Sequence, residues 1–178
     1  MSVFTNPVSR SAEQAGAYVA AVLGLLGDRN PTDVLRSTPA ALDALVRPLT
    51  PAQAVRPEGD GKWSIRHVLQ HLADSELMWG VRLRLVLAQD RPALTGYDQD
   101  LWAERLHYDH ADAAQAARDF AVLRQANLRV LDHCTPADLD RAGVHVERGE
   151  ETVRHMIRLY AGHDLLHLRQ IERIRAAV

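Results

Sequence analysis

The chain has 178 residues, of which 47% are apolar and 25% are charged, and its formal net charge is −2. A chain of this length is expected to form one compact domain, so a single domain is predicted over residues 1–178. Its one Cys cannot form an intramolecular disulfide, which favours a reducing, cytoplasmic location. The near-neutral charge argues against nucleic acid as the main partner, because such proteins need a basic face.

An apolar stretch near the start of the chain, residues 15–27, resembles the core of an export signal in length. It follows Glu13 rather than a basic cluster, and no small-residue cleavage pattern comes after it. It is also too short to span a bilayer. We therefore expect a buried bundle helix and no membrane partner, with an export signal as the alternative.

Short helix signals fill the first third of the chain. The first predicted helix covers residues 12–26 and ends at Gly27. Asn30-Pro31 and Thr38-Pro39 each place a capping side chain before a proline at the first helical position, which predicts two proline-started turns. Thr50-Pro51-Ala52-Gln53 has the pattern of a capping box and predicts a third such start.

Three further long helices are predicted from apolar residues at helical spacing. The first runs from an N-cap at Ser64 to Gln89, the second from Asp109 or Asp112 to about His133, and the third from Thr152 to about Ala176. The 18-residue connection from Arg91 to Tyr108 is long for a bundle, and such loops are often functional.

No window alternates apolar and polar residues for long, so a sheet is not expected, and residues 141–150 are the one candidate for extended backbone. The predicted fold class is all-α, a four-helix bundle with short connecting helices.

Nine His are an unusually high number for a chain of this length, and four of them form two pairs with a spacing of four residues. His163 and His167 belong to the last predicted helix, and His67 and His71 to the helix that starts at Ser64. Residues four apart share a helix face, so both imidazoles of a pair could bind one ion. One His of the earlier pair could complete a three-His site with an open coordination position. The alternative is that the pairs cap carbonyls or lie at the surface.

The sequence His163-Asp164-Leu165-Leu166-His167 is similar to a shortened zinc-protease motif, in which the acid is the general base. Asp164 has one methylene fewer than Glu, and no third ligand follows in a protease-like arrangement. We therefore interpret Asp164 as a solvated acid beside the metal-binding face.

Three separated motifs resemble the DinB superfamily, in particular its YfiT-like branch. They are the segment Gly61-Lys62-Trp63-Ser64-Ile65-Arg66-His67-Val68-Leu69-Gln70-His71-Leu72-Ala73-Asp74-Ser75-Glu76, then Arg82-Leu83-Arg84-Leu85 with Pro92, Tyr97-Asp98 and Trp102-Ala103-Glu104, and finally Leu159-Tyr160-Ala161-Gly162-His163 with His167. The resemblance covers residues 60–175 and implies a four-helix bundle that holds a divalent metal, Zn or Ni in many members, on three His. The motifs place the ligands at His71, His163 and His167, whereas His67 falls at a variable position.

The resemblance associates this branch with metal-dependent hydrolases and with S-transferases that use bacillithiol. Our leading hypothesis is a metal-dependent S-transferase that joins a small-molecule thiol, bacillithiol or a similar one, to an electrophile, because metal coordination lowers the pKa of a thiol. Hydrolysis by metal-activated water is the alternative enzyme. A non-enzymatic metal-binding stress protein is the alternative outside enzymes. Family members commonly form homodimers, so a homodimer is expected.

Seven further residues are candidates for supporting the metal or lining its pocket. Asp74, Ser75 and Arg82 follow His71 at helical offsets and could orient a ligand or bind a substrate carboxylate. Tyr97 and Trp102 could cover the pocket, although aromatic residues in such loops are often core plugs. His67 and His155 are possible supporters of the ligands, and the other four His need no function. Cys134 is predicted to be inert, so any thiol would come from the substrate.

Overall fold

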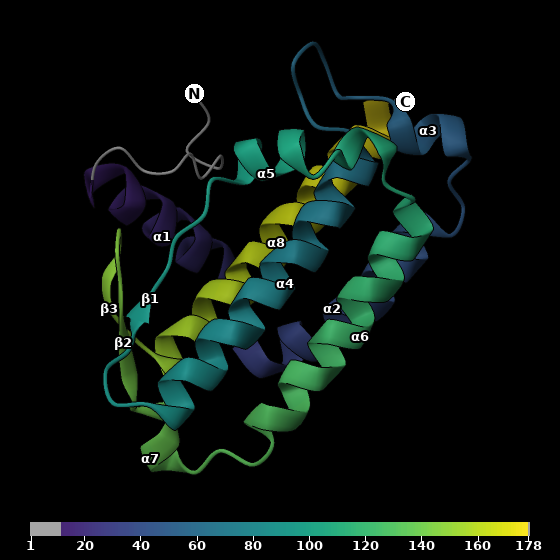
Figure 1. Cartoon of the computed structure of the whole chain (residues 1–178). Helices are drawn as coiled ribbons and strands as arrows, with labels where there is room; N and C mark the ends of the chain where they lie inside the picture. The colour runs from purple at the N-terminus through teal and green to yellow at the C-terminus, as the bar shows by residue number, and fades with distance from the viewer. Residues whose placement is uncertain (1–11, 178) are drawn as a thin grey trace.

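Four long helices lie side by side in the computed structural model, which describes residues 12–177 (Figure 1). They are α2 (Pro31–Val46), α4 (Ile65–Ala88), α6 (Ala113–Leu131) and α8 (Val153–Ala177). α2 and α4 each pack against both α6 and α8, which closes the bundle. α1 (Ala12–Leu26) packs against α8 from outside this bundle. The four-helix bundle predicted from the sequence is therefore confirmed, with α2 rather than α1 as its fourth helix.

The helix ends follow the capping signals, with one exception. Asn30 accepts a hydrogen bond from the Thr32 backbone N–H and starts α2. Thr50 and Gln53 form a capping box at α3 (Pro51–Val55). The predicted turn at Thr38-Pro39 is wrong, because Pro39 lies inside α2 and the Thr38 hydroxyl donates to the Val34 carbonyl within the same helix at 2.8 Å.

Ser64 occupies the N-cap position of α4, but its side chain makes no capping hydrogen bond to the backbone. Its hydroxyl is instead 2.8 Å from Nδ1 of His67. At the end of α1, Gly27 takes a φ of +55°, a conformation that favours glycine and that stops the helix where the sequence predicted.

Two apolar clusters fill the bundle at different levels along its axis. One cluster contains Trp79 and Leu83 of α4 with Met156 of α8, and the other contains Leu72 of α4 with Ile171 of α8. Ser75 and Glu76 of α4, and His163, Asp164 and His167 of α8, fall in the sequence between these two groups of buried apolar residues. The apolar clusters therefore hold the two helices together on both sides of a polar layer.

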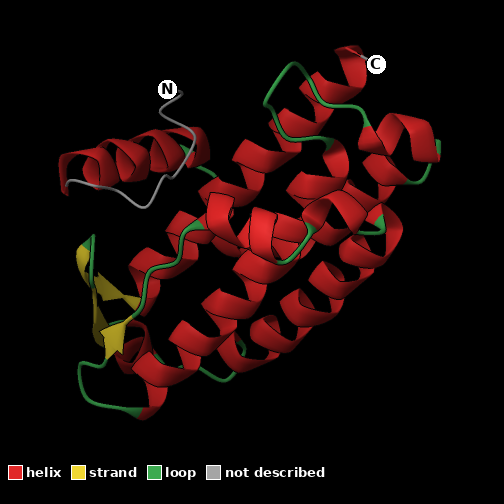
Figure 2. Ribbon diagram, turned by 45° about the horizontal axis from the view of Figure 1, so that its top comes forward, coloured by secondary structure: helices red, strands yellow, loops and turns green. Residues whose placement is uncertain are grey.

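A small sheet lies at one side of the helices (Figure 2). It is formed by β1 (Ala93–Leu94), β2 (Ala142–His145) and β3 (Gly149–Thr152), with β1 parallel and β3 antiparallel to β2. The expectation of no sheet is wrong, because strands of two to four residues are too short to show alternation. Residues 141–150, the one candidate for extended backbone, do contribute β2 and the start of β3.

Short elements interrupt the connections between the long helices. α5 (Gln99–Arg105) lies within the predicted 18-residue loop, and the 3₁₀ turn η1 (Tyr108–His110) begins at the last residue of that loop. α7 (Pro136–Leu139) follows α6. The side chain of Asp98 accepts hydrogen bonds from two backbone N–H groups and starts α5. Among the described residues, no helix combines the length and the apolar character needed to cross a membrane.

Candidate metal centre

Three buried His side chains from two helices meet in the polar layer of the bundle. The Nε2 atom of His163 on α8 lies 3.1 Å from Nε2 of His71 on α4 and 3.1 Å from Nε2 of His167 on α8. One ligand atom from each of the three lies within 4.8 Å of the others. The structure thus brings together the three residues that the family motifs selected.

All three imidazoles are held in the neutral form that binds metals. Burial, and then the neighbouring His167, lower the pKa of His71 well below its ordinary value. Burial, followed by the nearby His residues, has the same effect on the pKa of His163. Burial lowers the pKa of His167 to about 4, although its hydrogen bond to Gln170 opposes this shift. Nδ1 of His167 lies 2.8 Å from the side-chain oxygen of Gln170, so Nδ1 carries the proton and Nε2 presents a lone pair to the cluster.

The cluster fits a divalent ion. Two nitrogens that bind zinc tetrahedrally at 2.0–2.1 Å are separated by about 3.3 Å. The two Nε2 separations of 3.1 Å are close to that value. Without an ion, three neutral imidazoles would direct their Nε2 atoms at one another with too few protons to pair them all. Three protein ligands are also the number found in catalytic zinc sites, where substrate or water completes the set.

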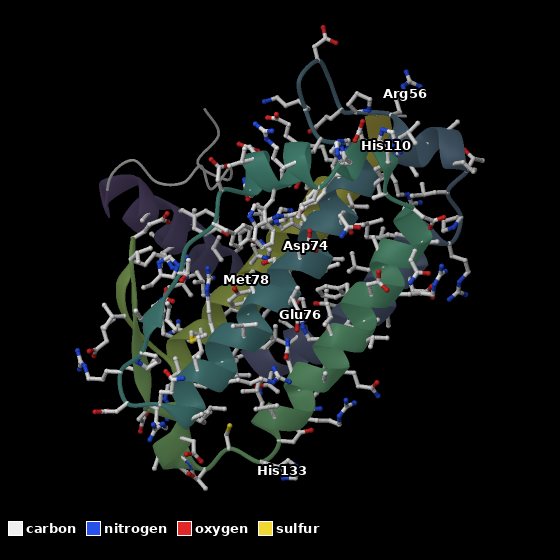
Figure 3. The ribbon with its side chains drawn as sticks, viewed as in Figure 1. Arg56, Asp74, Glu76, Met78, His110 and His133 are labelled. Carbon is white, nitrogen blue, oxygen red and sulfur yellow. The ribbon has the colours of Figure 1, made fainter. Side chains whose placement is uncertain are left out.

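A buried ion network lies directly behind the cluster. Arg124 of α6 donates to both carboxylate oxygens of Asp164, at 2.5 and 2.9 Å, and to Glu76 of α4 at 2.8 Å. Glu76 points toward α6 in Figure 3 and also accepts from Asn127 at 2.8 Å. Asp164 is only 1% exposed, so the interpretation of this residue as a solvated acid is wrong. Asp164 faces α6, where the positive charge of Arg124 balances the negative charge of its carboxylate.

Sequence reasoning did not identify Arg124 as a core residue. A usable signal was present, because Arg124 lies four residues from Phe120 and four from Leu128, both of which are buried on the same face of α6. A cation at that position of an apolar face indicates a buried partner of opposite charge.

A small hollow, which we call the inner cavity, opens beside His71 and His163 and has a volume of about 40 Å³. Ser75, Arg82 and Tyr97 line it, as expected for pocket residues. The remaining lining residues come from α1, the loop before α5, α5 itself, the sheet region and α8: Tyr18, Gly96, Gln99, His145, Glu147, Arg148, Leu159 and Tyr160. The sequence analysis did not identify His145 as a cavity residue. A single His gives no indication of such a role until β2 is seen to turn it inward.

Tyr18 reaches the cavity because α1 packs very closely on α8. A side chain at Gly162 would bring its Cβ within 2.3 Å of the Val22 carbonyl oxygen. Glycine at this position, next to His163, is therefore what permits the close approach of the two helices.

Four of the predicted supporting residues do not line the inner cavity. Asp74 accepts a hydrogen bond from the Tyr108 hydroxyl at 2.5 Å, and Trp102 packs on Tyr97 with ring centroids 4.4 Å apart. His67 contacts Ser64, as described above. His155 lies in the first turn of α8, about two turns before His163, and its backbone N–H donates to the Thr152 hydroxyl. These four residues support neighbouring elements and do not form the pocket wall.

The other three His residues neither belong to the cluster nor line the inner cavity. His110 and His133 lie at opposite ends of the bundle in Figure 3, and His107 precedes η1. Cys134 follows α6, and burial raises the pKa of its thiol, which agrees with the inert role predicted for it.

A second hollow, which we call the outer groove, lies next to His167 and has a volume of about 540 Å³. His167 lines it together with Trp63 and Lys62, and Gln99 lines both hollows. The candidate ligands are therefore reached from two separate spaces.

Comparison with known proteins places this arrangement in a family. The family model described as the DinB superfamily matches residues 35–171. The Bacillus subtilis protein named "Putative metal-dependent hydrolase YfiT" is 30% identical over 139 residues, which cover 78% of each chain. A relative from Oceanobacillus iheyensis, named as a hydrolase of the same kind, is 31% identical over 62% of this chain and 64% of its own.

The solved structure of YfiT superposes with a TM-score of 0.76 at 28% identity, and covers 81% of this chain and 83% of that one. It is described as a probable metal-dependent hydrolase with an unusual four-helix bundle topology.

Proposed function

We propose that this chain, which belongs to the DinB superfamily, is a metal-dependent S-transferase that joins a low-molecular-weight thiol to a small electrophile. The coarser part of this proposal, a metal-dependent enzyme, is supported by the names of its relatives and by the buried cluster of His71, His163 and His167. Zinc or nickel suits three imidazole ligands. The finer part, thiol transfer, depends on the spaces around the cluster.

The observation that carries the transferase is that two hollows meet at the three His residues. The inner cavity reaches His71 and His163, and the outer groove reaches His167. A transferase must hold two reactants side by side, and a groove of about 540 Å³ beside a separate cavity gives each reactant a place next to the ligands. The small inner cavity suits a small group of one reactant, and the larger outer groove suits the bulk of the other.

When bound, a divalent metal would lower the pKa of a coordinated thiol or water so that its anion is available near neutral pH. The protein's own residues prepare the ligands for that role. Burial keeps the three His neutral, and Gln170 fixes the tautomer of His167. The bundle excludes bulk water from the ligand atoms, since all three side chains are less than 9% exposed.

The thiol would come from the substrate. Cys134 is the one Cys in the chain, and it lines neither hollow. Ser75, Tyr97 and Tyr160 line the inner cavity, and their hydroxyls are candidates to hydrogen-bond a bound reactant. Bacillithiol is the candidate thiol that the family resemblance suggests.

Hydrolysis is the second candidate, favoured by one specific residue as well as by the names of the relatives. Glu147 lines the inner cavity and is half-buried, so it is a candidate general base for metal-activated water. This reading needs a substrate that is cleaved without any added thiol.

The test begins with the metal content of untagged protein. About one divalent ion per chain is expected in the wild type and in His110→Ala, an exposed control, and none in His163→Ala. Protein without bound metal in the wild type would remove both enzymatic readings. Protein that binds metal but shows neither transferase nor hydrolase activity would favour the non-enzymatic metal-binding protein.

The metal-loaded protein is then incubated with monochlorobimane and candidate thiols, bacillithiol included. A thiol-dependent conjugation rate that falls in His71→Ala and persists in His110→Ala is the expected result. A rate equal in wild type and His71→Ala would reject the transferase. Ester cleavage that needs no thiol and is lost in Glu147→Gln would favour hydrolysis.

A further inference from the structure

The guanidinium of Arg82 is a buried cation with neutral partners. Arg82 is 4% exposed, and it donates to the Thr95 carbonyl from Nε and Nη2 and to the Tyr160 hydroxyl from Nη1. Among the described residues, no carboxylate lies within salt-bridge distance of it, in contrast to the buried Arg124. A buried charge without a counter-ion is costly, so this position favours an incoming anion.

Arg148 reaches the same cavity from the turn between β2 and β3. Its Nε and Nη2 atoms donate to the two oxygens of Glu151, at 2.5 and 3.0 Å. This pair is neutral as a unit, and Nη1 of Arg148 makes no hydrogen bond within it. The other acid at the cavity, Glu147, is half-buried and forms no salt bridge with either Arg among the described residues.

His145 adds a hydrogen-bond donor that has no partner. Its Nδ1 accepts a hydrogen bond from the Glu147 backbone N–H at 3.2 Å, so neutral His145 carries its proton on Nε2. Nε2 is buried and unpaired among the described residues, and the side chain lines the inner cavity. Burial, and then the charges of Arg148 and Arg82, lower the pKa of His145 to about 4, so it is neutral near pH 7. An unpaired buried donor calls for an acceptor.

The size of the inner cavity limits which acceptor can enter. About 40 Å³ is room for roughly three water molecules, which is the size of a carboxylate and smaller than a phosphate or an aromatic ring. Because His71 and His163 line the same cavity, a group held there lies beside the candidate metal ligands.

We infer that the inner cavity is a carboxylate subsite, in which Arg82, His145 and Arg148 bind a carboxylate of the substrate next to the metal centre. This inference rests on the proposed function, and it narrows the substrate to small molecules that carry a carboxylate close to the reacting atom. Arg82 provides the opposite charge, and His145 and Arg148 donate further hydrogen bonds. The remainder of a larger substrate would extend away from this cavity.

The first test uses metal-free protein, because carboxylates can bind metals directly. Acetate is expected to bind by ligand-observed NMR titration, and acetamide, its neutral analogue, at least tenfold more weakly. Arg82→Met should weaken acetate binding about tenfold or more, whereas Arg154→Met, at an exposed Arg paired with Asp140, should leave it unchanged. Equal binding of acetate and acetamide, or tighter binding of inorganic phosphate, would overturn the subsite.

Arg82→Met could disturb folding, because Arg82 also holds Thr95. His145→Phe is the second variant, since it removes the unpaired donor while keeping a ring in place, and it should weaken acetate binding several-fold. Unchanged acetate affinity in a folded His145→Phe protein contradicts a role for this donor. Circular dichroism checks that each variant is folded.

The second test separates the subsite from the proposed function. In cobalt-loaded protein, mercaptoacetate should produce the thiolate-to-cobalt absorption band at a concentration at least tenfold lower than 2-mercaptoethanol does. Arg82→Met should abolish this difference and leave the band with 2-mercaptoethanol unchanged. Thiol binding without a preference for mercaptoacetate would reject the subsite alone. Acetate binding that depends on Arg82, with no thiol band at all, would reject thiol transfer alone.

Discussion

Arg124 on α6 donates hydrogen bonds to both carboxylate oxygens of Asp164 on α8, the residue directly after the candidate ligand His163. The same guanidinium donates to Glu76 on α4 and to the Leu35 carbonyl of α2, so one buried cation connects all four helices of the bundle at the level of the metal centre. Two carboxylates and one Arg are enclosed together, with Arg124 and Asp164 both about 1% exposed. The network thus fixes the rotation of α8 that turns His163 toward His71.

Replacing Arg124 with Met is expected to destabilise the protein strongly. The change leaves Glu76 and Asp164 buried without a cation, and breaking a buried ion pair from one side costs about 3–5 kcal/mol. Arg36→Met is the control, because Arg36 pairs with Asp132 at the surface and should contribute less than about 1 kcal/mol. Urea unfolding of metal-free protein measures both. Similar small decreases in the free energy of unfolding of the two variants would contradict the role of Arg124 as the central cation.

Gly162→Ala is expected to destabilise the contact between α1 and α8. The new Cβ would lie 2.3 Å from a backbone oxygen of α1, which cannot rotate away as a side chain can. Overpacking of this kind costs about 1–3 kcal/mol. Gly24→Ala, on α1 itself, would add a Cβ that meets nothing within 4 Å and should stabilise by about 0.5–1 kcal/mol. The thermal unfolding temperature is therefore predicted to fall in Gly162→Ala and to rise in Gly24→Ala. A lower unfolding temperature in both variants would argue against the close approach of α1 and α8.

The stability of the metal-free protein should fall in mild acid. Burial lowers the pKa of His145 to about 4 from an ordinary value of 6.5, so in this range the unfolded state binds a proton that the folded state does not. Its contribution to stability is complete above pH 6.5 and is lost as the pH falls toward 4, at up to about 1.4 kcal/mol per pH unit.

Unfolding free energies measured by urea titration between pH 7 and pH 4.5 test this prediction. His145→Gln should make the decline shallower, whereas His133→Gln, at an exposed position near the end of α6, should leave the slope unchanged. Equal slopes in wild type and His145→Gln would mean that His145 is protonated in the folded state.

The bundle and the ligand set could be predicted because their signals are local. Periodic apolar residues and caps mark α4, α6 and α8 within a few residues, and His163 and His167 lie one helical turn apart. His71 needed more than periodicity, since His67 has an equal claim from spacing, and the family motif alone separated the two.

The walls of the inner cavity could not be predicted, because they depend on contacts distant in sequence. His145 enters through a strand of four residues, whose pairing with β1 joins segments about fifty residues apart. Arg148 faces the cavity while bound to Glu151, and Tyr18 reaches it through the close approach at Gly162. Apolar spacing gives no information on such placements. The burial of Asp164 likewise follows from a partner on another helix.

Gln170 is expected to tune metal affinity although it does not contact the ligand atoms. Its side-chain oxygen accepts the Nδ1 proton of His167 at 2.8 Å, which keeps the lone pair of Nε2 directed at the cluster. Loss of a hydrogen bond of this type typically lowers metal affinity about 10–100-fold. Gln170→Leu should show this loss in competition with a zinc-binding dye, and Gln115→Leu, on the exposed surface of α6, should bind as the wild type does. Nitrogen NMR of metal-free protein gives an independent reading: the proton of His167 should lie on Nδ1 in the wild type and redistribute between the two nitrogens in Gln170→Leu. A variant that keeps both the affinity and the tautomer would show that packing alone orients His167.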